Sequence, residues 1–252
     1  MQLFLKNNLP NILTLLNVAC GFAALISLVD ERYVAAILWM FIATVFDGID
    51  GKIAALLNSK SEIGKTLDSL SDVISFALLP GVAVYFLYAR LPDPSWLTLA
   101  IAWVVGIGYT CAGILREIRF LSGQSQRTRR EGFIGLPIAP PAGFNVTIVS
   151  LVYLLPDVFM TPLVLVLVLG QIVLDAYLMT ISNINYLRWG GKLIAVQAFT
   201  ALFFGILGYL LLGTLSTALA LFFMAFCLVY IWSHVIRAGV LRLLSRQKTA
   251  PA

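Results

Sequence analysis

Residues 34–57 read VAAILWMFIATVFDGIDGKIAALL, an apolar run of helical length with two aspartates near its end. A helix needs about 20 mostly apolar residues to cross a bilayer. Because the run is continuously apolar and does not alternate, it predicts a transmembrane α-helix and not a barrel strand. Charged groups inside such a helix are costly and usually face a cavity or a partner. Asp47 and Asp50 therefore mark this segment as a candidate site.

The rest of the chain repeats this apolar pattern. Of the 252 residues, 60% are hydrophobic and 12% are charged, whereas about 25% of a soluble domain is charged. This composition excludes an ordinary water-soluble enzyme, a disordered chain and a nucleic-acid-binding protein whose surface is mostly charged. It predicts an all-α, polytopic integral membrane protein with about eight transmembrane helices. We expect these helices at residues 9–29, 34–57, 66–88, 96–115, 138–156, 161–185, 194–212 and 215–236.

Positive charge gathers on one side of the predicted helices. If the N-terminus is cytoplasmic, only Arg32 and Arg90 fall on the outer side, and Lys52 lies inside the second helix. The inner set is Lys6, Lys60, Lys65, Arg116, Arg119, Arg127, Arg129, Arg130, Arg188, Lys192, Arg237, Arg242, Arg246 and Lys248. Cytoplasmic loops of membrane proteins carry such an excess of Lys and Arg. Both termini should therefore be cytoplasmic, and the net charge of +5 points to membrane lipids as partners and not to nucleic acid.

Four aspartates form a compact pattern on two neighbouring helices. Asp47 and Asp50 are three residues apart, and Asp68 and Asp72 are four apart, so each pair shares one helical face. A short inner loop joins the two helices, which should bring all four carboxylates together near the cytoplasmic boundary. Oxygen ligands without His or Cys suit Mg²⁺, Mn²⁺ or Ca²⁺. Two such ions would use all four carboxylates and could clamp a phosphoryl group.

Glycines accompany these aspartates. Gly48, Gly51 and Gly64 interrupt segments that are otherwise helical, where each costs about 1 kcal/mol relative to Ala. Their missing side chains would let a bulky ligand or another backbone approach the carboxylates. Packing of helices through small residues is the alternative role for them.

The four aspartates are also compatible with a structural role or with transport. They could cap helices or pair with lysines, of which Lys52, Lys60 and Lys65 are near in sequence. They could also line the path of a cation transporter, since such a path needs buried acids. Transport favours acids near mid-membrane in several helices, whereas these four lie in two adjacent helices at one face.

The run from Asp47 to Ala55, followed by eight residues and then Gly64 to Asp72, resembles the signature of the CDP-alcohol phosphotransferase (CDP-alcohol phosphatidyltransferase) family. That signature reads D-x-x-D-G-x-x-A-R-x8-G-x3-D-x3-D. The resemblance implies a membrane enzyme with a six-helix catalytic core that moves a phosphatidyl group from a CDP-linked lipid to an alcohol and releases CMP. It also implies two divalent cations, Mg²⁺ or Mn²⁺, with Ca²⁺ as a non-productive occupant.

The resemblance assigns roles to individual residues. Asp47, Asp50, Asp68 and Asp72 would hold the metals, and Asp72 would also be the general base for the acceptor hydroxyl. The residues expected to bind the CDP-lipid are Thr14, Asn17, Gly48, Gly51, Lys52, Ala54, Gly64 and Lys65. Thr14 and Asn17 could instead form hydrogen bonds between helices.

One position departs from the signature. Its arginine is Ala55 here, and in the family that arginine lies close to the CDP end of the donor. Lys52 is three residues earlier on the same helix and could supply the missing positive charge.

Looser matches resemble the branch of the family that uses serine as acceptor. They include residues 9–22, residues 68–80, the run Leu115-Arg116-Glu117-Ile118-Arg119-Phe120 and residues 179–186. This branch implies CDP-diacylglycerol and L-serine as substrates, a homodimer, and the inner membrane of a prokaryote. Because serine carries a carboxylate, Arg116 and Arg119 are the candidate acceptor ligands. An orientation-setting role in the membrane is the alternative for this pair.

These matches also divide the chain. We expect one membrane domain over residues 1–252, with the catalytic signature in 9–88 and the rest of the core in 89–190. Residues 191–252 would add two C-terminal helices and a basic tail. The alternatives left open are another acceptor (glycerol phosphate, choline or an inositol phosphate), an archaeal-type lipid donor, a cation transporter and a catalytically silent scaffold.

Overall fold

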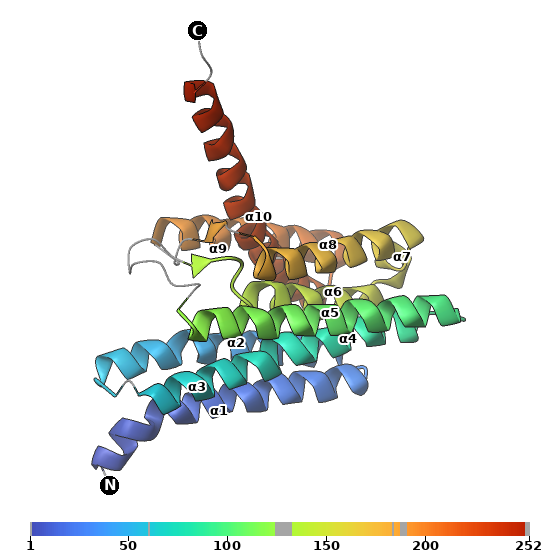
Figure 1. The fold of residues 1–252 in the computed structure, drawn as a ribbon. Helices are drawn as coiled ribbons and strands as arrows, with labels where there is room; N and C mark the ends of the chain where they lie inside the picture. The colour runs from blue at the N-terminus through green and yellow to red at the C-terminus, as the bar shows by residue number, and fades with distance from the viewer. Residues whose placement is uncertain (1, 60, 124–132, 183, 187–190, 250–252) are drawn as a thin grey trace.

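The computed structural model describes residues 2–59, 61–123, 133–182, 184–186 and 191–249, and these form a bundle of helices (Figure 1). Arg127, Arg129, Arg130, Arg188 and Lys60 lie outside the described residues. In chain order the helices are α1 Gln2–Val29, α2 Tyr33–Leu56, α3 Glu62–Asp72, the π-helix η1 Val73–Leu78, α4 Leu79–Ala89, α5 Trp96–Leu121, α6 Ala139–Leu154, α7 Pro156–Phe159, α8 Pro162–Thr180, α9 Gly191–Leu212 and α10 Leu215–Thr249.

The helices have the length and composition of membrane spans, which confirms the expected all-α polytopic fold. Among the described residues, six helical segments are long and apolar enough to cross a bilayer. They are Asn8–Val29, Tyr33–Leu56, Glu62–Ala89, Trp96–Leu121, Pro162–Thr180 and Leu215–Val240. Two shorter apolar helices, Ala139–Leu154 and Ala198–Leu212, occupy the other two expected positions.

Helix α6 lies at the centre of the bundle. Nearly all of its side chains are buried, from Pro140 to Val152, and it packs against α2, α4 and α10. On the site side, α1 packs along α2 and also contacts α3. The two helices that carry the four aspartates are thus joined by contacts with α1.

The single helix expected at residues 66–88 is observed as three consecutive segments, α3, η1 and α4. In η1 the backbone widens, and the N–H of Leu79 bonds to the carbonyl of Ile74, five residues earlier. Pro80 explains this change, because a proline inside a helix has no N–H and its ring clashes with the carbonyl four residues earlier. That carbonyl belongs to Phe76.

Several helices end at other residues than expected. The expected ends are where the apolar runs stop, whereas the observed helices continue through polar residues or end earlier. Helix α5 continues to Leu121, past the expected end at residue 115, since Arg116 and Glu117 are buried and paired with each other. Helix α10 continues to Thr249, because Arg, Lys, Gln and Leu favour helix even where the apolar run ends.

The expected helix at residues 161–185 is wrong in its last turn. Helix α8 ends at Thr180, and Asn185–Tyr186 forms a short strand, β2, antiparallel to β1 at Phe133–Ile134. The register pairs Phe133 with Tyr186 and Ile134 with Asn185. Gly135, with φ +83°, turns the chain here, and its N–H donates a 2.9 Å hydrogen bond to the Ile184 carbonyl.

Candidate active site

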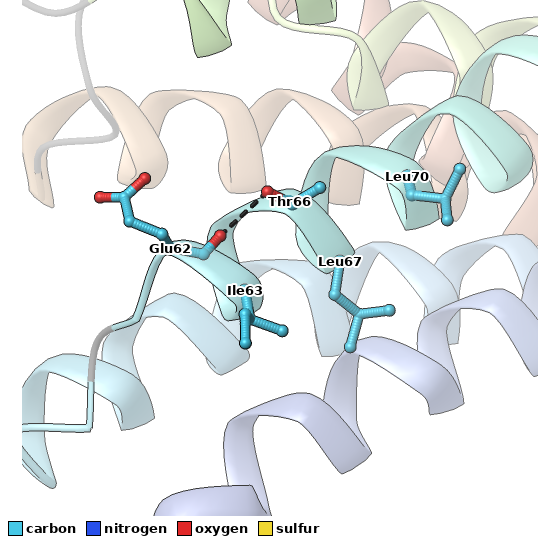
Figure 2. A pocket seen from close by; sticks show the side chains of 5 residues that line it. All are labelled: Glu62, Ile63, Thr66, Leu67 and Leu70. Carbon is cyan, nitrogen blue, oxygen red and sulfur yellow. Dashed lines mark hydrogen bonds between the residues drawn. The ribbon is translucent and has the colours of Figure 1, made fainter.

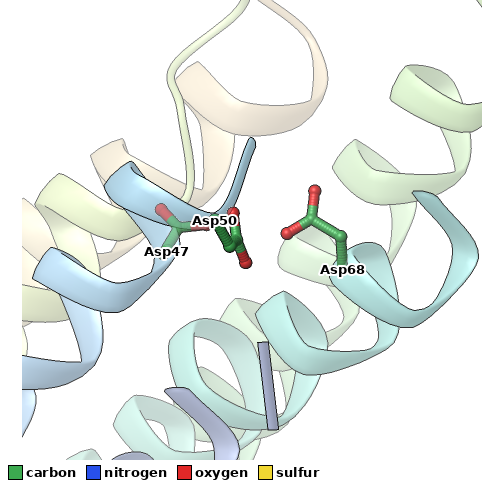
Figure 3. Close-up of side chains that lie close together, drawn as sticks. All are labelled: Asp47, Asp50 and Asp68. Carbon is green, nitrogen blue, oxygen red and sulfur yellow. The ribbon is translucent and has the colours of Figure 1, made fainter. Parts of the chain in front are cut away.

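Three of the four predicted aspartates meet where the C-terminal part of α2 faces α3. Asp47 and Asp50 extend from α2, and Asp68 faces them from α3 (Figure 3). One carboxylate oxygen from each residue lies within 4.8 Å of the other two. Asp50 is buried, whereas Asp47 and Asp68 are half-buried. This arrangement matches the convergence that the spacing predicts.

Asp72, the fourth aspartate, borders this cluster at the last residue of α3. It is buried and within electrostatic range of Asp47 and Asp68. Oδ1 of Asp68 and Oδ1 of Asp72 are both buried without a hydrogen-bond partner among the described residues. Ionised carboxylates repel each other and cannot donate hydrogen bonds. Unpartnered acidic oxygens at close range therefore fit a divalent cation, whose hard oxygen ligands they would be.

The neighbouring helix α1 fixes one of these carboxylates. The Thr14 hydroxyl donates a 2.8 Å hydrogen bond to Oδ2 of Asp50 and also lies 3.1 Å from the Pro10 carbonyl. The sequence allows Thr14 either to contact the donor or to bond between helices, and the observed bond is of the second kind.

Asn17 lies one turn further along α1 and is fully buried. Neither of its side-chain heteroatoms has a hydrogen-bond partner among the described residues. Its backbone carbonyl accepts a 3.3 Å hydrogen bond from Ser75. A buried amide without a hydrogen-bond partner is rare in folded proteins, so Asn17 is an unsatisfied polar group on the helix that packs along α2 and α3.

Among the lysines that the structure describes, neither Lys52 nor Lys65 pairs with the cluster, and Lys60 lies outside the described residues. Within the described part of the chain, the ion pairs are Arg32–Asp30 and Arg116–Glu117. Lys52 is exposed, and the Lys65 ammonium lies 5.9 Å from the centroid of the Phe120 ring.

The two arginines predicted for the acceptor take different positions. Arg116 is buried, and its charge acts on Asp47, Asp68 and Asp72. Arg119 instead donates a hydrogen bond to the Thr180 carbonyl at the end of α8. The structure thus brings Arg116 to the carboxylates, whereas Arg119 joins two helices.

Sequence reasoning missed Glu117. Its side chain is 3% exposed and forms an ion pair with Arg116, and it adds a fifth carboxylate within electrostatic range of the cluster. A buried ion pair is costly unless both partners are satisfied. An acidic residue directly after Arg116 in an otherwise apolar segment was the available signal.

The glycines near the cluster differ from each other. A Cβ placed on Gly48 or Gly51 would meet nothing within 4 Å, so both face open space. A Cβ on Gly64 would lie 3.1 Å from Ser61 Oγ and 3.2 Å from Asn11 Oδ1. A side chain at position 64 would therefore crowd Ser61 and Asn11, whereas Gly48 and Gly51 leave the α2 surface accessible. Ala54 is half-buried and Ala55 is exposed on the same helix end.

A groove of about 380 Å³ lies on another face of α3, lined by Glu62, Ile63, Thr66, Leu67 and Leu70. In Figure 2 the Thr66 hydroxyl bonds to the Glu62 carbonyl at 2.9 Å, and the apolar side chains project to one side of the helix. No predicted site residue lines this groove.

Comparisons with known proteins connect this arrangement to a family. A model of the CDP-alcohol phosphatidyltransferase family matches residues 7–174, which include all four aspartates. The CDP-diacylglycerol–serine O-phosphatidyltransferase of Helicobacter pylori (strain J99) is 31% identical over 204 residues, or 77% of this chain and 81% of that protein. The archaetidylserine synthase of Methanothermobacter thermautotrophicus is 32% identical over 188 residues, or 73% of this chain and 71% of that protein.

A mycobacterial relative matches a shorter stretch. The CDP-diacylglycerol–serine O-phosphatidyltransferase of Mycobacterium leprae is 32% identical over 139 residues, which is 54% of this chain and 43% of that protein. The chain therefore spans less than half of the length of this relative. The family model, in contrast, covers more than half of the chain and contains the whole aspartate pattern. The chain belongs to the CDP-alcohol phosphatidyltransferase family.

Proposed function

We propose that the protein transfers the phosphatidyl group of CDP-diacylglycerol to the hydroxyl of L-serine, giving phosphatidylserine and CMP. The observation that carries this proposal is the meeting of Asp47, Asp50 and Asp68, with Asp72 beside them. The Helicobacter and Mycobacterium relatives are named CDP-diacylglycerol–serine O-phosphatidyltransferases, which supports serine as the acceptor.

The aspartates would hold two divalent cations, Mg²⁺ or Mn²⁺. Asp47, Asp50 and Asp68 offer oxygens that are close together, and Asp72 adds a buried, unpartnered oxygen. When bound, such ions neutralise a diphosphate and stabilise the leaving phosphate. Thr14 would hold Asp50 in a ligating orientation through its hydroxyl.

The chemical step needs a base and a positioned acceptor. Asp72 accepts the proton of the serine hydroxyl, and the serine oxygen forms a bond to the β-phosphorus, which bears the diacylglycerol. The bond from that phosphorus to the oxygen shared with the CMP moiety breaks, and CMP leaves with this oxygen. No covalent enzyme intermediate is required in this scheme.

Arg116 would bind the serine carboxylate, because its guanidinium fork suits bidentate recognition. Its position near the aspartates, where it forms an ion pair with Glu117, supports this role for Arg116. The Arg119 guanidinium bonds instead to the Thr180 carbonyl at the end of α8. The open surface at Gly48 and Gly51 would receive the cytidine diphosphate, with Lys52 and Lys65 nearby in sequence as cationic partners.

The proposal includes the membrane location and the orientation of the chain. The excess of Lys and Arg on one side supports a cytoplasmic position for both termini and the site, and the bacterial relatives support a prokaryotic inner membrane. We expect a homodimer, in which residues 9–88 carry the catalysis and residues 191–252 are additional to the core.

A second donor is favoured by one specific observation. The archaeal relative is named an archaetidylserine synthase, which keeps serine as the acceptor and changes the lipid. An ether-linked CDP-lipid is therefore the alternative donor to test.

The deciding experiment measures CMP release by the purified protein in detergent. CDP-diacylglycerol or its ether-linked analogue is supplied with Mg²⁺ or Mn²⁺ and with serine, glycerol phosphate, choline or inositol phosphate. Serine-dependent CMP release supports the proposal, and release with only another alcohol would overturn the choice of acceptor. Asp157→Asn, on exposed α7, is the matched control for aspartate variants.

Absence of CMP release with every alcohol would contradict an enzymatic function and favour the silent scaffold. Cation flux across sealed vesicles without any CDP-lipid would instead support transport. Each of these outcomes separates the proposed enzyme from one alternative.

A further inference from the structure

The π-helix η1 begins at the residue after Asp72 and separates the helix that bears two aspartates from α4. π-turns are rare and occur mostly as single bulges, often at functional sites. Each residue of an α-helix contributes about 100° of rotation and 1.5 Å of rise. One extra residue in the turn therefore rotates α3 about its axis relative to α4 and changes which residues of α3 face α2.

Two side-chain hydroxyl groups on α5 lie within hydrogen-bond distance of backbone carbonyls in this turn. Tyr109 Oη donates to the Phe76 carbonyl at 3.3 Å. Thr110 Oγ1 lies 3.3 Å from the Ala77 carbonyl and also 3.0 Å from the Gly106 carbonyl of its own helix, so its one hydrogen is shared between the two acceptors. Pro80 cannot supply an N–H to Phe76, so the Tyr109 hydroxyl takes the place of the missing backbone donor. Tyr109 is 1% exposed and Phe76 and Ala77 are fully buried, which keeps water from satisfying these carbonyls.

From the other side, helix α1 accepts hydrogen bonds both from the last turn of α3 and from the π-turn. Ser71 Oγ donates to the Thr14 carbonyl at 3.1 Å, and Ser75 Oγ donates to the Asn17 carbonyl at 3.3 Å. A Cβ on Gly21 would lie 2.5 Å from Ser75 Oγ, so α1 and η1 are in close contact. With α1 fixing one side, the rotation of α3 depends on how α5 holds the other.

We infer that Tyr109 and Thr110 are positioning residues that stabilise the π-turn, so that Asp68 and Asp72 face Asp47 and Asp50. This inference rests on the proposed function, because it treats the aspartates as the metal site. Without these hydrogen bonds from α5 the π-turn is no longer fixed on that side, so α3 can rotate and the ligand oxygens on the two helices move apart. The consequence is weaker binding of divalent cations without loss of the fold.

The test measures Mn²⁺ affinity by electron paramagnetic resonance on the full chain in detergent, together with the melting temperature. Tyr109→Phe and Thr110→Val each remove one hydroxyl and keep the shape of the side chain. We expect about 5-fold weaker Mn²⁺ binding for each and more than 10-fold for the double variant, since one hydrogen bond contributes about 0.5–1.5 kcal/mol. Thr110→Ser, which keeps the hydroxyl, should bind Mn²⁺ as the wild type does.

Tyr177→Phe, at a half-exposed position on α8, is the matched control for the loss of a phenol and should bind Mn²⁺ normally. A lower melting temperature with unchanged Mn²⁺ affinity in Tyr109→Phe and Thr110→Val would overturn the inference and leave only a structural role. If Tyr109→Phe does not fold, the Thr110→Val and Thr110→Ser pair still decides the question. Failure of the wild type to bind Mn²⁺ would contradict the proposed metal site itself.

Discussion

The Thr14 hydroxyl on α1 donates a 2.8 Å hydrogen bond to Oδ2 of Asp50 on α2, in a buried setting. This bond ties the first helix to one of the three clustered carboxylates. Hydrogen bonds to charged groups contribute about 1.5–3 kcal/mol. Helix α1 therefore contributes to the site by orienting a carboxylate, in addition to packing.

Replacing Thr14 tests this contribution. Thr14→Val removes the hydroxyl and keeps the shape, so we expect the activity at limiting Mn²⁺ to fall roughly 10-fold or more. Thr14→Ser keeps the donor and should retain most of the activity. Initial rates of CMP release over a Mn²⁺ titration measure the effect. Equal rates for the two variants would show that Thr14 does not orient Asp50.

Asp72 is proposed as the base. Asp72→Asn keeps the size of the side chain and removes its capacity to accept a proton, so CMP release should fall by about 10²–10⁴-fold. Binding of a CDP-lipid, measured by calorimetry in detergent, should change much less. Full activity in Asp72→Asn would contradict the assignment, and the Asp157→Asn control should match the wild type.

Arg116 and Arg119 are separable by their surroundings. Arg116→Lys keeps the charge and loses the planar fork, so the KM for serine should rise roughly 10-fold. Arg119→Lys should leave that KM unchanged, because Arg119 bonds to the Thr180 carbonyl. Steady-state kinetics with varied serine distinguish the two. A larger effect from Arg119→Lys would reverse the assignment.

Variants at the exposed end of α2 test whether Lys52 compensates for the signature arginine that is replaced by Ala55. Lys52 and Ala55 are both exposed there. Lys52→Ala should raise the KM for CDP-diacylglycerol by up to about 5-fold, the range of an exposed ion pair, and Lys52→Ala with Ala55→Arg should restore it. The compensation is refuted when both Lys52→Ala and Ala55→Arg leave the donor kinetics unchanged.

The backbones of α4 and α5 are in close contact, so a larger residue at this contact should destabilise the protein. A Cβ on Gly106 would lie 2.6 Å from the Gly81 carbonyl oxygen. Gly106→Ala should therefore lower the melting temperature by roughly 5 °C, since overpacking costs about 1–3 kcal/mol. Gly108→Ala, where a Cβ would meet nothing within 4 Å, is the control and should not lower it. A thermal melt in detergent compares the two, and equal melting temperatures would exclude a special role for Gly106.

The sequence alone predicts the helices and the meeting of Asp47, Asp50 and Asp68, because apolar length and i, i+3 spacing are local properties. It does not predict the π-turn after Asp72. That turn depends on Pro80 and on hydroxyls of α5, which are far apart in sequence and meet only in the folded protein.

The choice between Arg116 and Arg119 shows the same limit. Both residues lie in the last two turns of the same helix, so their spacing in the sequence does not show which of them binds the acceptor. Only the packing of α8 against α5 directs Arg119 to Thr180 and leaves Arg116 with Glu117 beside the aspartates. The limited space at Gly64, where a Cβ would lie 3.2 Å from Asn11 Oδ1 on α1, is likewise visible only in the folded protein.

The carboxylate cluster is proposed, above all, to support transfer of a phosphatidyl group to serine. Mass spectrometry of the products formed by wild type, Asp68→Asn and Asp157→Asn in the presence of Mn²⁺ tests this claim most directly. We predict equal molar amounts of phosphatidylserine and CMP for wild type and Asp157→Asn, and a loss of at least about 100-fold for Asp68→Asn. Undiminished phosphatidylserine formation by Asp68→Asn, or CMP released without any phosphatidylserine, would contradict it.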